Sequence, residues 1–383
     1  MENSDLTFEQ GPIRPPSEAE SLLIRVTRNC PWNRCAFCHL YKGSRFSPRS
    51  VEEVKSDIDA VRTIAEEIQS LSRQIGSGGE VTQKVARKIL ENPDLAYPYK
   101  YVAIWLYRGG KTAFLQDANT MVLKTGKLAE ILKYLKKTFP SLERITSYSR
   151  SQTIARKTVQ ELKTLRSAGL NRLHVGFESG YDPLLTLVKK GTTAEEHTVA
   201  GRRVVESGIE LTEYYMPGLG GRDMSENHAI ASARVLSEIN PTFIRLRTSV
   251  FLPGMPLADE IEKKTFIPLD DDETVMELRL FLEGLNDISS TVLSDHIINL
   301  LPQVEGTLPE DKGAMLQVID DYLSLDPETR ILYRAGRRAG FLTSPAQLSH
   351  PVYLQKVQDL LAALEGKFGS TEEGLSRLLG SYI

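Results

Sequence analysis

The chain carries all of its cysteines in one short stretch, TRNCPWNRCAFCH, at residues 27–39. Cys30, Cys35 and Cys38 lie within nine residues, and the other residues of the 383-residue chain include no further cysteine. Three thiols cannot all pair in disulfides, and a disulfide closing so short a loop would be strained. Thiolates at such short spacing chelate a soft metal, so the stretch predicts a metal centre around which the chain must fold.

Two kinds of metal centre agree with three clustered thiols. A structural zinc site needs four protein ligands, and His39 is the candidate for the fourth. An iron–sulfur cubane held by three cysteines leaves one iron open to a small chelating molecule. Phe37 can shield a cluster edge or stack on a bound base, and no second CxxC or HxxxH completes a zinc knuckle. We therefore favour the cubane and keep zinc as the alternative.

At this stretch the sequence resembles the radical SAM enzymes. The resemblance rests on C-x4-C-x2-C with an aromatic residue before the last cysteine, although the family usually has three residues where residues 31–34 stand here. It implies a [4Fe–4S] cluster on Cys30, Cys35 and Cys38, with S-adenosylmethionine (SAM) on the fourth iron. It further implies reductive cleavage of SAM to methionine and a 5′-deoxyadenosyl radical, and an electron donor such as flavodoxin or ferredoxin.

The composition bounds the class of protein. With 41% hydrophobic and 25% charged residues, the chain is long enough for one barrel-sized domain and a smaller one. A net charge of −3 disfavours broad electrostatic binding to nucleic acid. The sequence shows no run of 18 apolar residues and no charged-then-apolar leader, so we expect no membrane span or secretion signal. Three reduced thiols indicate a cytoplasmic protein.

Strand-like apolar runs alternate with helical patterns along most of the chain. About six such units predict a parallel sheet with right-handed crossovers, hence an α/β fold: a partial (β/α)6 TIM-like barrel with chemistry at the carboxyl ends of its strands. A doubly wound open sheet is the alternative, disfavoured because no GxGxxG follows the first strand. The strand-like runs are residues 21–27, 112–119, 144–149, 172–178, 209–216 and 243–250.

The pattern divides the chain into three parts. We interpret residues 1–20 as an N-terminal arm, flexible or draped, and residues 21–260 as the radical SAM partial barrel. A helical insertion at about 76–108 is either a lid or substrate wall or an ordinary packing excursion. Residues 261–383 are expected to be a helical region without strands that covers the barrel's open side or mouth. In it, the arginines at helical spacing are interpreted as a solvated face: Arg330, Arg334, Arg337 and Arg338.

Polar residues follow the second and third predicted strands. Gln116 and Asp117 stand where the resemblance places a motif that receives the methionine amino group of SAM. A helix cap formed by Asp117 and Asn119 is equally compatible with the pattern. Arg150 is the candidate partner for a ligand carboxylate, because its guanidinium is bidentate, with a surface charge as the alternative.

The segment VGFESGYDPLLTLVKKG, residues 175–191, resembles the corresponding part of oxygen-independent coproporphyrinogen III oxidase-like proteins. The resemblance implies that Glu178 binds the ribose hydroxyls of SAM and that Lys190, twelve residues later, binds its methionine carboxylate. The turn MPGLGG at 216–221 and the run RLRTSVFLPGMPL at 245–257 resemble the family's exits from its fifth and sixth strands.

Two further groups attract attention near the end of the predicted barrel. Arg245 and Arg247 alternate along a strand and require anions, either a substrate carboxylate or an internal acid such as Glu213. Asp295 and His296 lie in an apolar stretch as candidates for a proton donor or substrate contact, with packed or surface residues as the alternative.

We therefore predict an enzyme that cleaves SAM reductively and abstracts hydrogen from a small molecule. Because no cysteine remains for a second cluster, chemistry that depends on one is disfavoured. A zinc-stabilised, non-catalytic binding protein is the first alternative, and a radical SAM enzyme that acts on RNA is the second.

Overall fold

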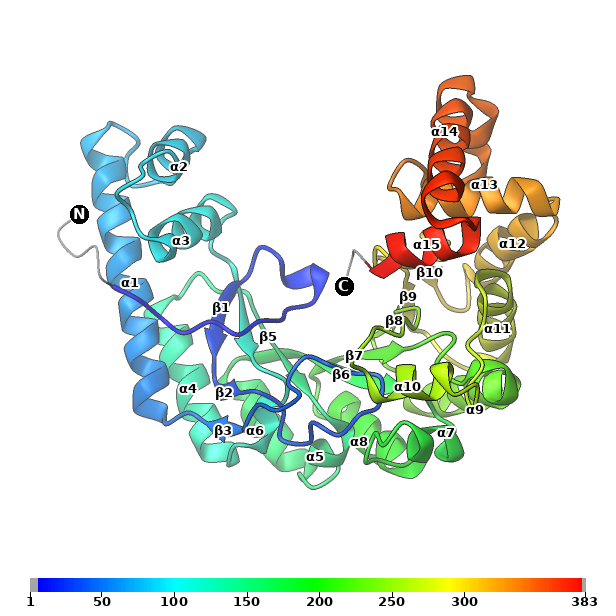
Figure 1. Cartoon of the computed structure of the whole chain (residues 1–383). Helices are drawn as coiled ribbons and strands as arrows, with labels where there is room; N and C mark the ends of the chain where they lie inside the picture. The colour runs from blue at the N-terminus through cyan, green and yellow to red at the C-terminus, as the bar shows by residue number, and fades with distance from the viewer. Residues whose placement is uncertain (1–5, 381–383) are drawn as a thin grey trace. The chain divides into compact units, whose positions relative to one another are not determined.

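The computed structural model, which describes residues 6–380, is a mixed α/β protein (Figure 1). Eight strands form one sheet in the order β1-β4-β5-β6-β7-β8-β9-β10, and β2 (Thr27–Arg28) pairs with β3 (Ser47–Pro48) in a small antiparallel ladder. The strands of the larger sheet are β1 (Leu22–Arg25), β4 (Thr112–Gln116), β5 (Arg144–Ser149), β6 (Leu170–Glu178), β7 (Glu210–Tyr215), β8 (Phe243–Leu246), β9 (Thr291–Leu293) and β10 (Gly306–Thr307).

The strand order confirms the predicted fold. β1 pairs with β4, β4 with β5 and β5 with β6, all parallel, and β7 pairs in parallel with β8. From β1 to β8 the strands follow one another in the sheet as they do in the sequence, with helices between them. A doubly wound sheet reverses its strand order at a switch point, which this order does not do. The chain therefore has the predicted partial (β/α)6 TIM-like arrangement.

The chain divides into two compact units. The division falls inside the cysteine stretch, between Asn33 and Arg34. Unit 1 holds the described part of Met1–Asn33 with Tyr41–Val175 and Glu206–Leu211, and unit 2 holds Arg34–Leu40, Gly176–Val205 and the described part of Thr212–Ile383. The predicted domain boundaries at residues 20 and 260 stay predictions, and residues 1–5 and 381–383 of the predicted end segments lie outside the described residues.

In unit 1, the long helix α1 (Val51–Gln74) begins where the sequence places a cap. The Ser50 side chain accepts from the backbone N–H of Glu53, and the Glu53 side chain accepts from the N–H of Ser50. The apolar residues of α1 recur at helical spacing and are buried. The other α-helices that lie wholly in this unit are α2 (Gln83–Leu90), α3 (Tyr97–Tyr107), α4 (Thr125–Thr138), α5 (Ser151–Ile154) and α6 (Val159–Ala168).

The predicted helical insertion consists of α2 and α3. They pack on each other, and α3 also packs on α1 (Figure 1). Pro98 lies in the first turn of α3, where its missing N–H costs nothing, so it starts this helix and does not interrupt it.

Unit 2 corrects the prediction that the chain lacks strands beyond residue 261. β9 pairs in parallel with β8, and β10 pairs antiparallel with β9. β9 has only three residues, which is too few to show the alternation of apolar and polar residues typical of a strand, so no strand was expected here. The α-helices that lie mainly or wholly in this unit are α7 (Asp182–Leu187), α8 (Ala194–Glu206), α9 (Gly221–Ile239), α10 (Pro256–Glu262), α11 (Asp271–Gly284), α12 (Lys312–Leu323), α13 (Pro327–Arg338), α14 (Pro351–Phe368) and α15 (Thr371–Gly380).

The interpretation of the α13 arginines as a solvated face is wrong. Arg334 and Arg338 are buried, and both pair with Asp271 at the start of α11, at 3.4 and 2.5 Å. Arg330 pairs with Asp272 at 3.0 Å, and Arg337 donates to the Asn299 carbonyl at 3.1 Å. The partners belong to other segments of unit 2, so the spacing within α13 could not reveal them.

Among residues 6–380, no helix is both long enough and apolar enough to cross a membrane.

Candidate active site

The first part of the cysteine stretch is shaped by two asparagines of unit 1. Asn29 and Asn33 have positive φ angles of 65° and 48°, a conformation that asparagine tolerates better than most residues. The Asn33 N–H donates to Cys30 Sγ at 3.4 Å, and its side-chain amide donates to the Tyr41 carbonyl. The loop around Cys30 is therefore closed on itself before the chain enters unit 2.

Gln116 and Asp117, the predicted contacts of the SAM amino group, are both buried at the exit of β4. The Gln116 amide accepts from the Gly11 N–H at 2.8 Å and donates to the Ile13 carbonyl at 2.6 Å, so it holds the N-terminal arm. Asp117 Oδ2 accepts from Arg25 Nε at 2.8 Å and from the Asn29 N–H at 3.1 Å. The role of Gln116 and Asp117 toward SAM stays a prediction. The carboxylate oxygen that could accept from the amino group of SAM is Asp117 Oδ1, which is buried and has no hydrogen-bond partner among residues 6–380.

Arg150, the predicted carboxylate partner, is buried at the exit of β5. Its guanidinium carbon lies 4.9 Å from the ring centroid of Trp32, inside the cysteine stretch, and both residues belong to unit 1. Cation–π stacking of this kind orients a guanidinium without consuming its hydrogen-bond donors. The role of Arg150 toward a ligand carboxylate stays a prediction.

The second part of the cysteine stretch is attached to unit 2 through Ala36. The Ala36 N–H donates to the Val188 carbonyl at 2.8 Å, and its carbonyl accepts from the Leu257 N–H at 3.0 Å. Ala36 is buried in an apolar cluster with Leu184, Val188, Leu257 and others, and Phe37 packs partly buried against the same cluster. The segment that carries Cys35 and Cys38 is thus fixed on both sides of its backbone.

Glu178 and Lys190, the predicted contacts of the SAM ribose and carboxylate, meet in unit 2. Lys190 Nζ lies 3.0 Å from Glu178 Oε1, and their side chains are 8% and 12% exposed. Lys190 Nζ also lies 5.7 Å from the ring centroid of Phe37. A Cβ added at Gly176 would approach Glu178 Oε1 to 2.3 Å and Lys190 Nζ to 2.8 Å, so glycine leaves the space that this pair occupies. The structure therefore brings together three of the predicted site residues.

Glu213 on β7 is a buried carboxyl near this pair. It is 1% exposed, and its Oε2 has no hydrogen-bond partner among residues 6–380. Burial raises the pKa of Glu213 well above its ordinary value, the charge of Glu178 acts in the same direction, and that of Lys190 opposes them. The suggestion that Glu213 neutralises Arg245 is not supported, because Arg245 forms its ion pair with Asp295.

Two residues that the sequence analysis missed hold the strand exits in place. Buried His228 on α9 bonds Ser179 Oγ through Nδ1 at 2.8 Å and the Met216 carbonyl through Nε2 at 3.0 Å. Burial lowers the pKa of His228, which agrees with a neutral ring that donates from Nε2. Glu277 on α11 accepts from the Gly218 N–H at 2.7 Å, within the predicted glycine-rich turn. Both lie on helices without any motif, so no local signal pointed to them.

Asp295 and His296 follow β9 in unit 2. His296 is partly buried, and its pKa is lowered to about 4, first by burial and then by the charge of Arg247, while Asp295 acts in the opposite direction. His296 is therefore neutral near pH 7 and poorly suited to donate a proton as an imidazolium.

The sequence model of the radical SAM superfamily, as a protein family, matches residues 24–233, which is more than half of the 383 residues. This chain belongs to the radical SAM superfamily. It is an enzyme, and its cofactors are a [4Fe–4S] cluster and SAM. The zinc-stabilised, non-catalytic alternative is set aside for this reason.

Individual relatives of this radical SAM protein are distant. The tRNA uridine(34) acetyltransferase of Methanocaldococcus jannaschii is 20% identical over 117 residues, or 30% of this chain and 22% of the relative. The chain thus matches about a fifth of the length of its curated relatives. The archaeal Elp3 structure from Methanocaldococcus infernus has a TM-score of 0.41 at 13% identity and covers 55% of this chain and 53% of its own. Coproporphyrinogen III oxidase from Escherichia coli, a radical SAM enzyme, has a TM-score of 0.45 at 16% identity, with 69% and 52% covered.

The residues of this chain fit the two cofactors. None of the three cysteines is in a disulfide and all are partly exposed, and thiolate is the ligand that iron–sulfur clusters require. Among residues 6–380, no three cysteine, histidine or acidic side chains gather around a point for a single metal ion. A cubane binds each thiolate at a different iron, so its ligands need not converge on one point. Acceptor oxygens on Glu178 and a cation on Lys190 suit the hydroxyls and the carboxylate of SAM.

Proposed function

We propose that this radical SAM enzyme abstracts a hydrogen atom from a small organic substrate, with Cys30, Cys35 and Cys38 as the cluster ligands. When bound, the cluster and SAM supply a one-electron cleavage that yields methionine and a 5′-deoxyadenosyl radical. The protein binds and orients the reacting groups and excludes water from them. We also propose a cytoplasmic location, because the three thiols must stay reduced, and a flavodoxin or ferredoxin as the electron donor.

One observation carries this proposal: Phe37 of the cysteine stretch and the Glu178–Lys190 pair lie together in unit 2. Lys190 Nζ is held between the Phe37 ring and the Glu178 carboxylate, within reach of the segment that bears Cys35 and Cys38. SAM would replace the contact of Lys190 with Glu178 by a carboxylate for the lysine and hydroxyls for the glutamate. Arg150, Gln116 and Asp117 remain proposed contacts of SAM or substrate from unit 1.

A small-molecule substrate is favoured over RNA by charge. The chain carries 50 acidic and 47 basic residues, which gives no general attraction for a phosphate backbone. The likeness to the tRNA acetyltransferases supports the RNA alternative, yet it is confined to 117 residues.

The test is the production of 5′-deoxyadenosine by anaerobically reconstituted protein with dithionite as the reductant. Replacing Cys30, Cys35 and Cys38 together by alanine is expected to abolish both iron binding and SAM cleavage while the helical circular dichroism is retained. The control is His39→Ala, because a zinc site would lose its fourth ligand whereas the cubane would keep its iron. Undiminished 5′-deoxyadenosine production by the triple variant would refute the proposal.

A further inference from the structure

An exposed arginine stands at the exit of β8 in unit 2. Arg247 follows this strand directly, its side chain is exposed, and no acid pairs with it among residues 6–380. The neighbouring cation in the strand, Arg245, is buried and its charge is matched by Asp295. Of the two positive charges at this strand exit, that of Arg245 is therefore paired with an acid, and that of Arg247 is not paired with one among the described residues.

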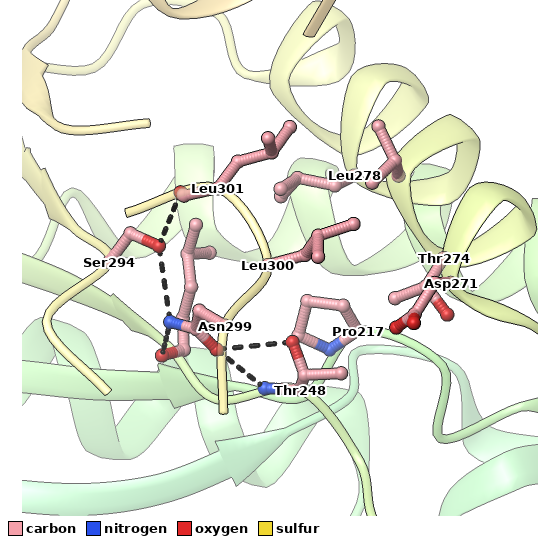
Figure 2. Close-up of a pocket in the computed structure, with 11 residues that line it drawn as sticks. Pro217, Thr248, Asp271, Thr274, Leu278, Ser294, Asn299, Leu300 and Leu301 are labelled. Carbon is pink, nitrogen blue, oxygen red and sulfur yellow. Dashed lines mark hydrogen bonds between the residues drawn. The ribbon is translucent and has the colours of Figure 1, made fainter. Parts of the chain in front are cut away.

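The backbone around Arg247 is fixed from two directions. Its N–H donates to the Tyr215 carbonyl at 3.0 Å, and the Ser249 N–H donates to the Pro217 carbonyl at 2.8 Å, which extends the hydrogen bonding of β8 with β7. On the other side, Asn299 accepts from the Thr248 N–H at 3.0 Å and donates to the Leu246 carbonyl at 2.8 Å, as Figure 2 shows around Asn299. A rigid backbone that presents an unpaired guanidinium is a preorganised binding group.

The two faces of this segment differ. Leu246 and Thr248 line a small cavity of about 20 Å³ together with Asn299, Leu278 and other residues, as drawn in Figure 2, and this space has room for one water molecule. Because side chains alternate along an extended segment, Arg245 and Arg247 lie on the face opposite Leu246, and Ser249 follows two residues later. The cavity is too small for a ligand larger than water, so such a ligand would have to bind on the side of the arginines.

Two polar atoms of this segment are unsatisfied. Arg245 Nε and Ser249 Oγ are buried and have no hydrogen-bond partner among the described residues. Buried donors without partners are uncommon in proteins, and each calls for an explanation such as a bound water or ion or a functional role. His296, whose environment includes Arg247, adds no charge because its ring is neutral near pH 7. Two unsatisfied donors and one unpaired guanidinium call for an acceptor that carries negative charge.

We propose that Arg247, Ser249 and Arg245 bind an oxyanion of the substrate, a carboxylate or a phosphate. The inference rests on the proposed function in that the ligand is the small molecule from which hydrogen is abstracted. The site lies at the carboxyl end of a strand, where the chemistry of such a barrel takes place. Arg247 supplies a bidentate guanidinium, and Asp295 keeps Arg245 in place.

The experiment titrates inorganic phosphate and, separately, succinate into the reconstituted, anaerobic 383-residue protein at constant ionic strength, with calorimetry and thermal unfolding as readouts. Arg247→Gln removes the positive charge and leaves a side chain of similar length. Arg247→Lys keeps the charge but loses the bidentate guanidinium. The matched control is Arg234→Gln on α9, also exposed and without an acidic partner among the described residues, which changes the net charge equally.

We expect at least one of the two anions to bind the wild-type protein and the Arg234 variant alike. The affinity of Arg247→Gln should fall roughly tenfold or more, and Arg247→Lys should lie between, because charged hydrogen bonds contribute this much. Whichever of phosphate and succinate binds more tightly identifies the class of anion, phosphate or carboxylate. Equal affinity of all variants, or no binding of either anion, would overturn the inference.

Two further readouts separate this inference from the proposed function. If 5′-deoxyadenosine forms but neither anion binds, the oxyanion site fails while the radical SAM activity stands. If Arg247→Gln weakens SAM binding as strongly as anion binding, Arg247 serves SAM itself and the inference is wrong. Tight binding of a short single-stranded oligoribonucleotide that is lost in Arg247→Gln would likewise replace the small molecule by RNA.

Discussion

The buried carboxyl of Glu213 makes a prediction about how stability depends on pH. Its raised pKa means that the folded protein keeps a proton that the unfolded chain, with an ordinary carboxyl near 4.5, releases. A group that binds its proton more tightly in the folded state contributes its full stabilisation below the unfolded pKa. This contribution is lost progressively as the pH rises from the unfolded pKa through the folded pKa. The free energy of unfolding should therefore fall with increasing pH above 4.5 because of this one residue.

The perturbation is Glu213→Gln, which keeps the shape of the side chain and removes its titration. One proton held only by the folded state corresponds to a slope of about 1.4 kcal/mol per pH unit. The difference in unfolding free energy, wild type minus variant, should approach that slope from about one pH unit above 4.5 up to the folded pKa. All other titrating groups cancel in this difference as long as the substitution leaves the environments of Glu178 and Lys190 unchanged.

The assay is urea unfolding of both proteins at several pH values between 5 and 8, followed by circular dichroism under anaerobic conditions with the cluster reconstituted. Parallel pH curves for the two proteins would show that Glu213 is ionised in the folded state. A wild-type advantage that grows with pH would give the opposite sign and refute the reasoning outright.

Three further outcomes can be measured with the same preparations. Glu178→Gln should weaken SAM binding by roughly tenfold or more at normal iron content, because it removes charged hydrogen bonds; a loss of iron with the affinity would instead show a structural role. Arg338→Ala should cost roughly 1–3 kcal/mol of unfolding free energy, because it removes a buried guanidinium that donates to Asp271 and to the Ile298 carbonyl while Arg334 still pairs with Asp271; a cost below about 0.5 kcal/mol would contradict the buried ion pair. Ser50→Ala should cost about 1 kcal/mol at the start of α1, with Ser50→Asp as the control that retains the cap, and equal unfolding free energies for the two variants would argue against it.

Much of the fold could be predicted from the sequence because its helices and strands are long, and because residues at their ends mark where they start and stop. Ser50 and Glu53 mark the start of α1, and Gly169 ends α6 in the left-handed conformation that glycine favours. The alternation of such elements sufficed for the strand order from β1 to β8. β9 was missed because three residues carry no period.

The site could be predicted only in part because its remaining members act over long separations. Cys30 and Glu178 stand in motifs, whereas Glu277, His228 and Glu213 lie within ordinary helices and a strand. These three residues matter to the site because they are buried next to the ends of strands that are distant in the sequence. A local sequence pattern cannot indicate that a residue is buried against such a distant segment. The same reason explains why Asp295, and not Glu213, proved to be the partner of Arg245.

The attachment of Ala36 to Val188 and Leu257 has a consequence for biosynthesis. During translation, the segment that bears Cys35 and Cys38 leaves the ribosome long before either of its backbone partners exists. Its shape is completed only once about two thirds of the chain has been made and the distant pairing has closed. Iron delivered to a nascent chain would meet an unorganised loop, so maturation of the cluster is expected to follow synthesis of the protein.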